Sequence, residues 1–328
     1  MSTISKEEIF NISSAEQFEQ LVLRIFKIQA TENPVYASYL SYLGVDKENV
    51  QEIDKIPFLP IEFFKTKDVI LRGLSPSIIF SSSGTTGMQQ SKHLVSDVSI
   101  YEHSYRNAFH LFYGPIKNMA ILALLPSYLE RTGSSLIYMV DDLISGGHPA
   151  YSDYFLYNHE ALAVRMQQLK ESNTPALLIG VTYALLDFIE NFPMNFPNLM
   201  VMETGGMKGK RKEMIRIELH EILRKGFGVD QIHSEYGMTE LLSQAYSKGN
   251  GIFKCPPWMK VMIRDVNDPL AILPVGKTGV INVIDLANIN SCSFIATQDL
   301  GRTHHDGTFE IMGRFDQSDI RGCNLLIQ

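Results

Sequence analysis

The sequence predicts an α/β fold: a mostly parallel β-sheet flanked by helices, followed by a smaller β-rich region. Continuous apolar segments at 119–125, 176–181 and 199–203 alternate with segments whose apolar residues recur at helical spacing. Strands of a parallel sheet are buried on both faces and therefore show such continuous apolar runs. After about residue 250 the apolar segments are separated by turn residues, which is typical of antiparallel β-structure. We therefore expect two domains, 1–250 with a helical N-terminal segment and the α/β core, and 251–328 with the β-rich subdomain.

The individual elements follow from local patterns. Residues 14–44 are predicted to be helical, with Ser14 as an N-cap and apolar residues at helical spacing behind it. Asp306-Gly307 is a favoured hairpin turn. The segment 210–225 is predicted to be a helix with one apolar face, formed by Met214, Ile215, Leu219, Ile222 and Leu223. The other predicted elements are strands at 77–80, 119–125, 176–181, 199–203, 231–233, 261–264, 280–285 and 292–296, and helices at 97–113, 160–170 and 183–190.

Composition excludes several classes of protein. The chain has 328 residues, 45% of them hydrophobic, so it can bury a large core. Its net charge of −7 argues against a nucleic-acid partner, whose binding surface is normally basic. The longest apolar run, 119–125, is too short to span a membrane, and the polar N-terminus lacks the features of a signal peptide. Three widely spaced cysteines suggest neither a disulfide framework nor a metal site, so a cytoplasmic location is expected.

The most informative segment is 80–93, which follows a short apolar run. Small residues let backbone N–H groups approach an anion, and hydroxyl groups add hydrogen-bond donors. This composition predicts a loop that wraps a polyphosphate. The segment lacks the P-loop pattern, and Gly276-Lys277-Thr278 imitates only the end of that pattern because Ala271 stands in place of its first glycine. The candidate phosphate-binding residues are Ser82, Ser83, Gly84, Thr85, Thr86, Gly87 and Lys92.

Two further polar segments follow predicted strands. Gly205 and Gly206 come after the strand at 199–203 and would let the backbone lie close to an adenine edge. The segment 236–240 comes after the strand at 231–233. Ligands of open α/β sheets bind beyond the carboxyl ends of the strands, so we expect these two segments and the serine-rich loop to converge.

The segment 236–240 carries suitable chemistry for a nucleotide. The ring of Tyr236 offers a stacking surface for a base, with Gly237 beside it, and Thr239 offers a hydroxyl for a phosphate. Glu240 offers an oxygen ligand for Mg²⁺, which prefers carboxylates together with phosphates. The alternative interpretation is a capped helix start with Thr239 and Glu240 in its first turn.

Four segments resemble, in their order along the chain, the core motifs of the adenylate-forming superfamily of acyl-CoA ligases, luciferases and adenylation domains. They are the loop at 80–93, the segment 236–240, the segment 297–302 and Gly313-Arg314. The resemblance implies the large-domain fold of these enzymes, ATP and Mg²⁺ as cofactors, and catalytic roles for Thr239 and Glu240. It also implies that Asp299 holds the ribose hydroxyls, that Arg314 contacts the ribose or a phosphate, and that Lys92 follows the phosphate loop, here at a longer spacing. The chain ends soon after Gly313-Arg314, so the lid domain of most such ligases is expected to be absent.

Five further segments resemble the acyl-protein synthetase family of LuxE type. They are 57–65, 124–131, 185–188, 203–208 and 321–323. Members activate a fatty acid with ATP and pass the acyl group, through a cysteine near the C-terminus, to a partner reductase. Cys323 occupies the position of that cysteine, and Arg321 nearby would lower its pKa. Cys255 and Cys292 match no motif and are expected to be structural.

Two alternatives stay open. A ligase of the phenylacetate-CoA kind would form the same acyl adenylate but pass the acyl group to coenzyme A or a carrier protein. A non-catalytic nucleotide-binding scaffold would use the fold without turnover. His233, at a predicted strand end, is interpreted first as a structural residue and second as a catalytic one, and the histidines at 304–305 as surface residues. A G-x-S-x-G elbow is missing, which disfavours a hydrolase.

Overall fold

The computed structural model describes residues 4–82, 89–126, 133–205, 211 and 214–315. The chain folds into two compact units that are interleaved in the sequence. The first unit comprises Met1–Tyr101, Glu240–Ser243 and Lys254–Gln328, and the second comprises Glu102–Thr239 and Gln244–Phe253. The predicted division into domains at residue 250 stays a prediction, whereas the α/β fold class is confirmed.

The second unit contains a parallel sheet. Its strands β4 (Ala120–Leu124), β6 (Ala176–Val181), β7 (Leu199–Thr204) and β8 (Ile232–Tyr236) pair in this order, and every pair is parallel. β5 (Asp153–Tyr154) extends the sheet beyond β4, and β9 (Ala245–Ser247) pairs antiparallel with β8, with β10 (Ile252–Lys254) next in order. All residues of β4 and β6 are buried, as the continuous apolar runs predicted.

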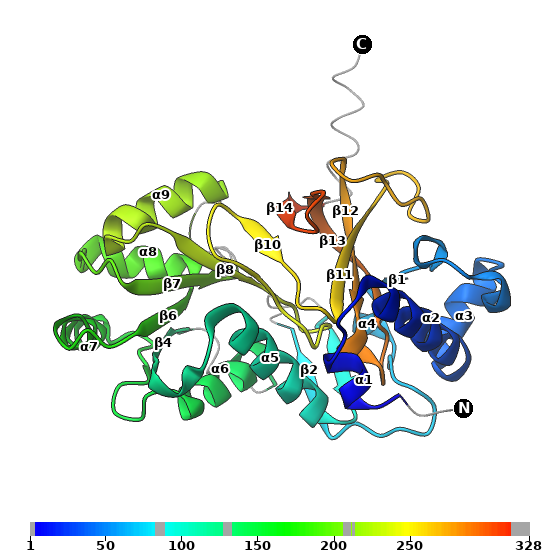
Figure 1. Ribbon diagram of the computed structural model, residues 1–328, viewed down its shortest axis with the longest axis horizontal. Coiled ribbons are helices and arrows are strands. Elements are labelled where there is room, and N and C mark those ends of the chain that lie inside the picture. The colour runs from blue at the N-terminus through cyan, green and yellow to red at the C-terminus, as the bar shows by residue number, and fades with distance from the viewer. Residues whose placement is uncertain (1–3, 83–88, 127–132, 206–210, 212–213, 316–328) are drawn as a thin grey trace, which may run out of the picture. The chain divides into compact units, whose positions relative to one another are not determined.

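Helices cover both faces of this sheet (Figure 1). α8 (Thr182–Asn191) and α9 (Arg216–Phe227) lie on one side of the strands, and α5 (Val98–Tyr113) and α6 (Ser135–Gly146) lie on the other. α7 (His159–Glu171) begins after Asn158, whose side chain accepts a hydrogen bond from the backbone N–H of Ala161. The arrangement is that of a doubly covered parallel sheet.

The predicted helix at 210–225 requires a correction. α9 begins only at Arg216, because Ile215 has an extended backbone with φ −68° and ψ 144°. Its buried apolar residues are Leu219, Leu223 and Phe227, whereas Ile215 and Ile222 are exposed. The predicted apolar face was therefore wrong at these two isoleucines, because Ile215 precedes the helix and the buried stripe follows i, i+4, i+8 from Leu219.

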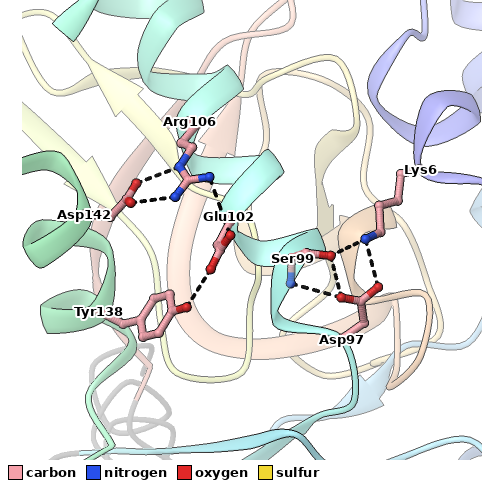
Figure 2. A network of polar contacts seen from close by, with 7 residues as sticks. All are labelled: Lys6, Asp97, Ser99, Glu102, Arg106, Tyr138 and Asp142. Carbon is pink, nitrogen blue, oxygen red and sulfur yellow. Dashed lines mark hydrogen bonds and ion pairs between the residues drawn. The ribbon is translucent and has the colours of Figure 1, made fainter. Parts of the chain in front are cut away.

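Polar contacts hold the start and the middle of α5 (Figure 2). Within the first unit, Asp97 accepts from the backbone N–H of Ser99 at 3.0 Å and pairs with Lys6 Nζ at 2.9 Å. Within the second unit, Arg106 forms a two-pronged ion pair with Asp142 of α6, at 2.7 and 2.6 Å. Because such a paired geometry resists sliding, it fixes the position of α5 against α6.

The first unit is built on an antiparallel meander. β11 (Met259–Arg264), β12 (Thr278–Asp285), β13 (Phe294–Thr303) and β14 (Phe309–Arg314) pair in chain order, and β1 (Leu59–Pro60) adds to β13 in parallel. The predicted hairpin turn connects β13 and β14, with Gly307 at φ 81°. β13 continues to Thr303, beyond the predicted end at residue 296, so the segment 297–302 lies in a strand.

Helices of the N-terminal segment pack on this unit. α2 (Ala15–Glu32) and α3 (Pro34–Tyr42) confirm the predicted helical region 14–44, and Ser14 caps α2 by accepting from the backbone N–H of Gln17. α1 (Lys6–Phe10) precedes this region and was not predicted. α4 (Phe63–Thr66) is a short helix after β1. An aromatic cluster joins α2 and α3 to β13, since Phe26, Tyr36 and Phe294 have ring centroids 6.0–6.1 Å apart.

The strand before the serine-rich loop is not part of the parallel sheet. β2 (Ile78–Ser81) and β3 (Lys92–Val95) form a two-stranded antiparallel sheet of their own. The expectation that the loop follows a parallel strand at the carboxyl edge of the sheet was therefore wrong. Ile79 is exposed while Phe80 is buried, and this alternation is the pattern of a half-buried hairpin.

Among the described residues, no helix has the length and apolar character needed to cross a membrane.

Candidate active site

The first unit connects two of the predicted motifs through a short chain of hydrogen bonds. The backbone N–H of Ser82 donates to the carbonyl of Ser91 at 3.0 Å, and the N–H of Ser91 donates to Ser82 Oγ at 2.9 Å. The hydroxyl of Ser91 in turn donates to the carboxylate of Glu240. The base of the serine-rich loop is thus linked to the glutamate of the segment 236–240. The candidate residues Ser83, Gly84, Thr85, Thr86 and Gly87 lie outside the described residues.

Glu240 is a buried carboxylate surrounded by compensating groups. Its side chain is 6% exposed, and burial raises its pKa. The hydrogen bond from Ser91 and the positive charges of Lys65 and Arg314 oppose that rise. A buried carboxylate that feels the charges of two cationic side chains is suited to a site for a ligand with negatively charged groups together with a cation.

The backbone around Glu240 does not start a helix. Residues 237–243 are all described, and none of them is helical, so the alternative of a capped helix start was wrong. The carbonyl of Glu240 instead accepts from Asn288 Nδ2 at 2.8 Å, and the residues after it are held by a side chain that sequence reasoning missed.

That side chain is Asp285, at the end of β12. Its carboxylate accepts from the backbone N–H groups of Leu242 and Ser243 at 2.8 and 2.9 Å, from Ser243 Oγ at 2.5 Å, and from the N–H of Ala287 at 3.1 Å. Burial raises the pKa of Asp285 to about 6, although these hydrogen bonds oppose the shift. The sequence signal was a carboxylate closing the apolar run 280–285, which is an unusual position for a charge.

The strands β13 and β14 place Asp299 beside Arg314. These two residues are direct partners in the antiparallel register. Arg314 also donates to Gln298 Oε1 at 3.4 Å, and the backbone N–H of Asp299 donates to Thr297 Oγ1 at 3.1 Å. Because the charge of Arg314 also acts on Glu240, the first unit brings together Ser82, Glu240, Asp299 and Arg314. Lys92 lies opposite Ser81 in the hairpin, directly after Ser91.

In the second unit, Gly205 and Tyr236 come from neighbouring strand ends. β7 and β8 are adjacent and parallel, with Thr204 opposite Glu235, so the predicted convergence is confirmed for these two segments. Gly205 has φ 70°, a conformation that favours glycine, and its carbonyl accepts from Thr182 Oγ1 at 2.7 Å. Gly206 lies outside the described residues.

Glu235 is a second carboxylate that sequence reasoning missed. Its Oε2 accepts from Thr204 Oγ1 at 2.6 Å, which joins the ends of β8 and β7. Burial, followed by the charge of Glu203, raises its pKa to about 7, and the bond from Thr204 opposes the shift. The residue directly precedes Tyr236, but its burial depends on strand pairing, which the sequence does not display.

Tyr236, Gly237 and Thr239 lie at the end of β8 and directly after it. The ring of Tyr236 is buried and lies edge-on to Phe253, with centroids 6.1 Å apart. At Gly237 a Cβ atom would lie 2.4 Å from Glu235 Oε1, so only glycine fits while the glutamate keeps its place. Thr239 is half-buried and directly precedes Glu240 in the chain.

The remaining candidate groups are unsuited to act as charged catalysts. Burial and the charge of Lys248 lower the pKa of His233 to about 4, so this histidine is neutral at pH 7. Burial raises the pKa of both Cys255 and Cys292 to about 12, which keeps their thiols protonated and unreactive. Cys323 lies outside the described residues. Within the described ranges, no three His, Cys, Asp or Glu side chains are grouped as a metal site would need.

The fold is that of the adenylate-forming ligases. The ATP-bound MatB from Rhodopseudomonas palustris matches with a TM-score of 0.54 and 18% identity, over 75% of this chain and 49% of that one. A 2-hydroxyisobutyryl-CoA ligase in complex with 2-HIB-AMP matches with a TM-score of 0.67 and 12% identity, over 96% and 72%. The same ligase with 2-HIB-AMP and CoA, in the thioesterification state, gives 0.65 and 13%. This chain therefore spans about half the length of MatB.

The sequence also matches a family model. The model of the acyl-protein synthetase family, LuxE, matches residues 4–328, and the chain belongs to this family. The resemblance inferred from the motifs is thereby confirmed. No curated protein matches the sequence.

Proposed function

We propose that this chain uses ATP to convert a carboxylic acid into an acyl adenylate and then passes the acyl group to a thiol. The observation that carries the proposal is the hydrogen-bonded link from Ser82 through Ser91 to Glu240, because it joins a serine-rich loop to a buried carboxylate. Membership of a family of acyl-protein synthetases and the fold shared with ATP-bound MatB support the same reaction.

In the first step, an oxygen of the acid's carboxylate attacks the α-phosphorus of ATP. One P–O bond forms, the bond to pyrophosphate breaks, and an acyl adenylate remains. Lys65 and Arg314, whose charges act on Glu240, would neutralise charge on the phosphates. Catalysis of this kind depends mainly on positioning and charge neutralisation.

Mg²⁺ is the proposed metal, and the donor set is compatible with it. Mg²⁺ at nucleotide sites usually takes one or two carboxylates and completes its shell with phosphates and waters. The single buried carboxylate of Glu240 meets that requirement, and a bound ion would supply charge neutralisation between the phosphates. From the motifs we propose nucleotide-binding roles for the following residues: Gly205, Gly206, Tyr236, Gly237 and Thr239 in the second unit, and Asp299 and the loop 82–87 with Lys92 in the first.

In the second step, a thiolate attacks the carbonyl carbon of the adenylate. A C–S bond forms, the C–O bond to the phosphate breaks, and AMP leaves. Cys323 is the proposed acceptor, because the raised pKa values of Cys255 and Cys292 keep those two thiols protonated. From Cys323 the acyl group would pass to a partner protein, a reductase or a carrier, in the cytoplasm, and a fatty acid is the proposed substrate.

A second candidate acceptor is coenzyme A. The 2-hydroxyisobutyryl-CoA ligase that shares this fold was crystallised with its acyl adenylate and CoA. Acyl transfer that continues in Cys323→Ser and requires CoA would favour this route. Loss of protein-bound acyl label in Cys323→Ser, with adenylation intact, would favour the internal cysteine.

The proposal is tested by carboxylate-dependent exchange of pyrophosphate into ATP, over acids from acetate to long-chain and aryl acids. Exchange is expected with one class of acid and is expected to fall at least tenfold in Glu240→Gln, since this change removes the buried negative charge. Glu52→Gln, at an exposed position, is the matched control and should retain the wild-type rate. Absence of exchange with every acid, despite measurable binding of ATP, contradicts the proposal and favours a non-catalytic nucleotide-binding protein.

A further inference from the structure

One face of the sheet in the second unit carries a group of polar side chains. Thr204 lies opposite Glu235 on the neighbouring strand, and Glu235 lies opposite Tyr246 of β9. Because side chains alternate along a strand, His233 shares this face with Glu235. Gln244 directly precedes β9. The face therefore collects hydrogen-bonding groups from three adjacent strands.

The end of α5 covers part of this face. Tyr113, the last residue of α5, has its hydroxyl 3.4 Å from His233 Nδ1, and its ring lies edge-on to Tyr246 with centroids 5.4 Å apart. Lys248 Nζ lies 5.6 Å from the centre of the Tyr113 ring. The ion pair of Arg106 with Asp142 holds α5 in this place (Figure 2). Most of these polar groups are thus in contact with one another.

Gln244 differs from these side chains. Its side chain is 3% exposed, and its Oε1 atom has no hydrogen-bond partner among the residues that the structure describes. A buried amide oxygen without a partner lowers the stability of a protein, and native proteins rarely keep one without a reason. A ligand that donates a hydrogen bond would be such a reason.

Gly237 lies between Gln244 and Glu235. A Cβ atom at position 237 would lie 3.3 Å from Gln244 Cγ and 2.4 Å from Glu235 Oε1. The Glu235 carboxylate and the Gln244 side chain thus both line the space beside one glycine, which a side chain at position 237 would otherwise occupy. Gly237 belongs to the segment that we propose to bind the nucleotide, so a bound adenylate would lie close to both acceptor groups.

We propose that Gln244 and Glu235 form a pair of hydrogen-bond acceptors that binds an uncharged donor group, an amino or a hydroxyl group, of the ligand at Gly237. The inference rests on the proposed adenylation, because a donor can come from the 6-amino group of adenine or from a hydroxyl group on the acid. Both sources have the same chemistry, and both reach the site as parts of one acyl adenylate.

The site is tested with Gln244→Leu, which removes the acceptor and keeps a side chain of similar size. Gln167→Leu, on the exposed surface of α7, is the matched control. Binding of ATP and of purine riboside triphosphate, which lacks the 6-amino group, is measured by calorimetry for each protein. Pyrophosphate exchange is measured with an accepted acid and its hydroxyl-bearing or hydroxyl-free counterpart.

The pattern of losses identifies the donor. A loss of about tenfold for ATP, with none for the purine analogue, assigns the 6-amino group; a loss of about tenfold for the hydroxylated acid alone assigns the acid. Equal effects on both members of each pair, or none, overturn the proposal. If wild-type protein neither binds ATP nor supports exchange, the proposed function itself fails. If exchange is intact but Gln244→Leu affects both members of each pair equally, only the inference about Gln244 fails.

A stability measurement separates this role from a structural one. Without ligand, Gln244→Leu should melt at the same temperature as the wild type or higher, because it removes an unpartnered buried polar atom. A melting temperature several degrees lower would mean that Gln244 supports the fold, and would contradict the inference. Glu235→Gln, which keeps an acceptor oxygen, should retain the discrimination that Gln244→Leu loses.

Discussion

The carboxyl group of Glu235 should make the stability of the protein depend on pH in a predictable direction. Its pKa is raised from 4.5 to about 7 in the folded protein, chiefly by burial and then by Glu203. The folded state therefore holds this proton more tightly than the unfolded state does. The stabilisation from this group is fully present below about pH 4.5 and is lost as the pH rises through 7.

The magnitude follows from the size of the shift. A rise from 4.5 to about 7 is roughly 2.5 pKa units, and each unit corresponds to about 1.4 kcal/mol, so the full effect is about 3 kcal/mol. Glu235→Gln removes the titration, while the amide oxygen can still accept the hydrogen bond from Thr204. Relative to the wild type, the variant should therefore gain about 3 kcal/mol of unfolding free energy between pH 4.5 and pH 8.

Denaturant unfolding of both proteins at half-unit steps of pH measures this difference. The groups that face Glu235, namely Glu203, Tyr113 and His233, titrate in both proteins, so their contributions largely cancel in the comparison. A difference in unfolding free energy that stays constant across this range, or that falls as the pH rises, would refute the burial argument for Glu235.

Three further changes test the scaffold around the site. Asp285→Asn should lower the unfolding free energy by about 3 kcal/mol, because it places an amide N–H₂ against the backbone N–H groups that now donate hydrogen bonds to the carboxylate. Urea denaturation measures this loss, and a loss below about 1 kcal/mol would contradict the prediction. Gly237→Ala should cost about 1–3 kcal/mol, since its Cβ displaces the Glu235 carboxylate, and combining it with Glu235→Ala should remove most of the cost; equal costs in both backgrounds would disprove the clash. Ser91→Ala should slow pyrophosphate exchange about tenfold without changing the melting temperature by more than a few degrees, because Glu240 loses its neutral donor; an unchanged rate would remove Ser91 from the proposed site.

Much of the fold was accessible from the sequence because the parallel strands are buried on both faces. The apolar runs of β4, β6 and β7 were found within one residue of their ends, since a strand enclosed by helices admits few polar residues. The start of α9 was missed because Ile215 continues the helical spacing without being helical. Periodicity records which side chains are apolar, but it does not record where the backbone changes conformation.

The candidate site was predictable where the chain carries its chemistry in short motifs. Glu240, Asp299 and Arg314 were named because each lies in a motif with a known order along the chain, and their roles stay predictions; the structure places all three in the first unit. Asp285 and Glu235 were missed, because their roles depend on strand pairing that brings distant backbone groups to them. The hairpin of β2 and β3 was also missed. Its second strand has only four residues, which is too short to show a clear pattern in the sequence. Contacts between distant segments are a property of the folded chain, which a single sequence does not display.

The most direct test of the proposed function follows the oxygen atoms of the acid. An accepted carboxylic acid labelled with ¹⁸O in both carboxyl oxygens is incubated with ATP, the enzyme and a thiol acceptor, and the products are analysed by mass spectrometry. Attack on the α-phosphorus predicts one ¹⁸O atom in the phosphate of AMP, none in pyrophosphate, and loss of the label transfer in Glu240→Gln. Label found in inorganic phosphate, with ADP as the second product, would mean attack on the γ-phosphorus and would contradict the formation of an acyl adenylate.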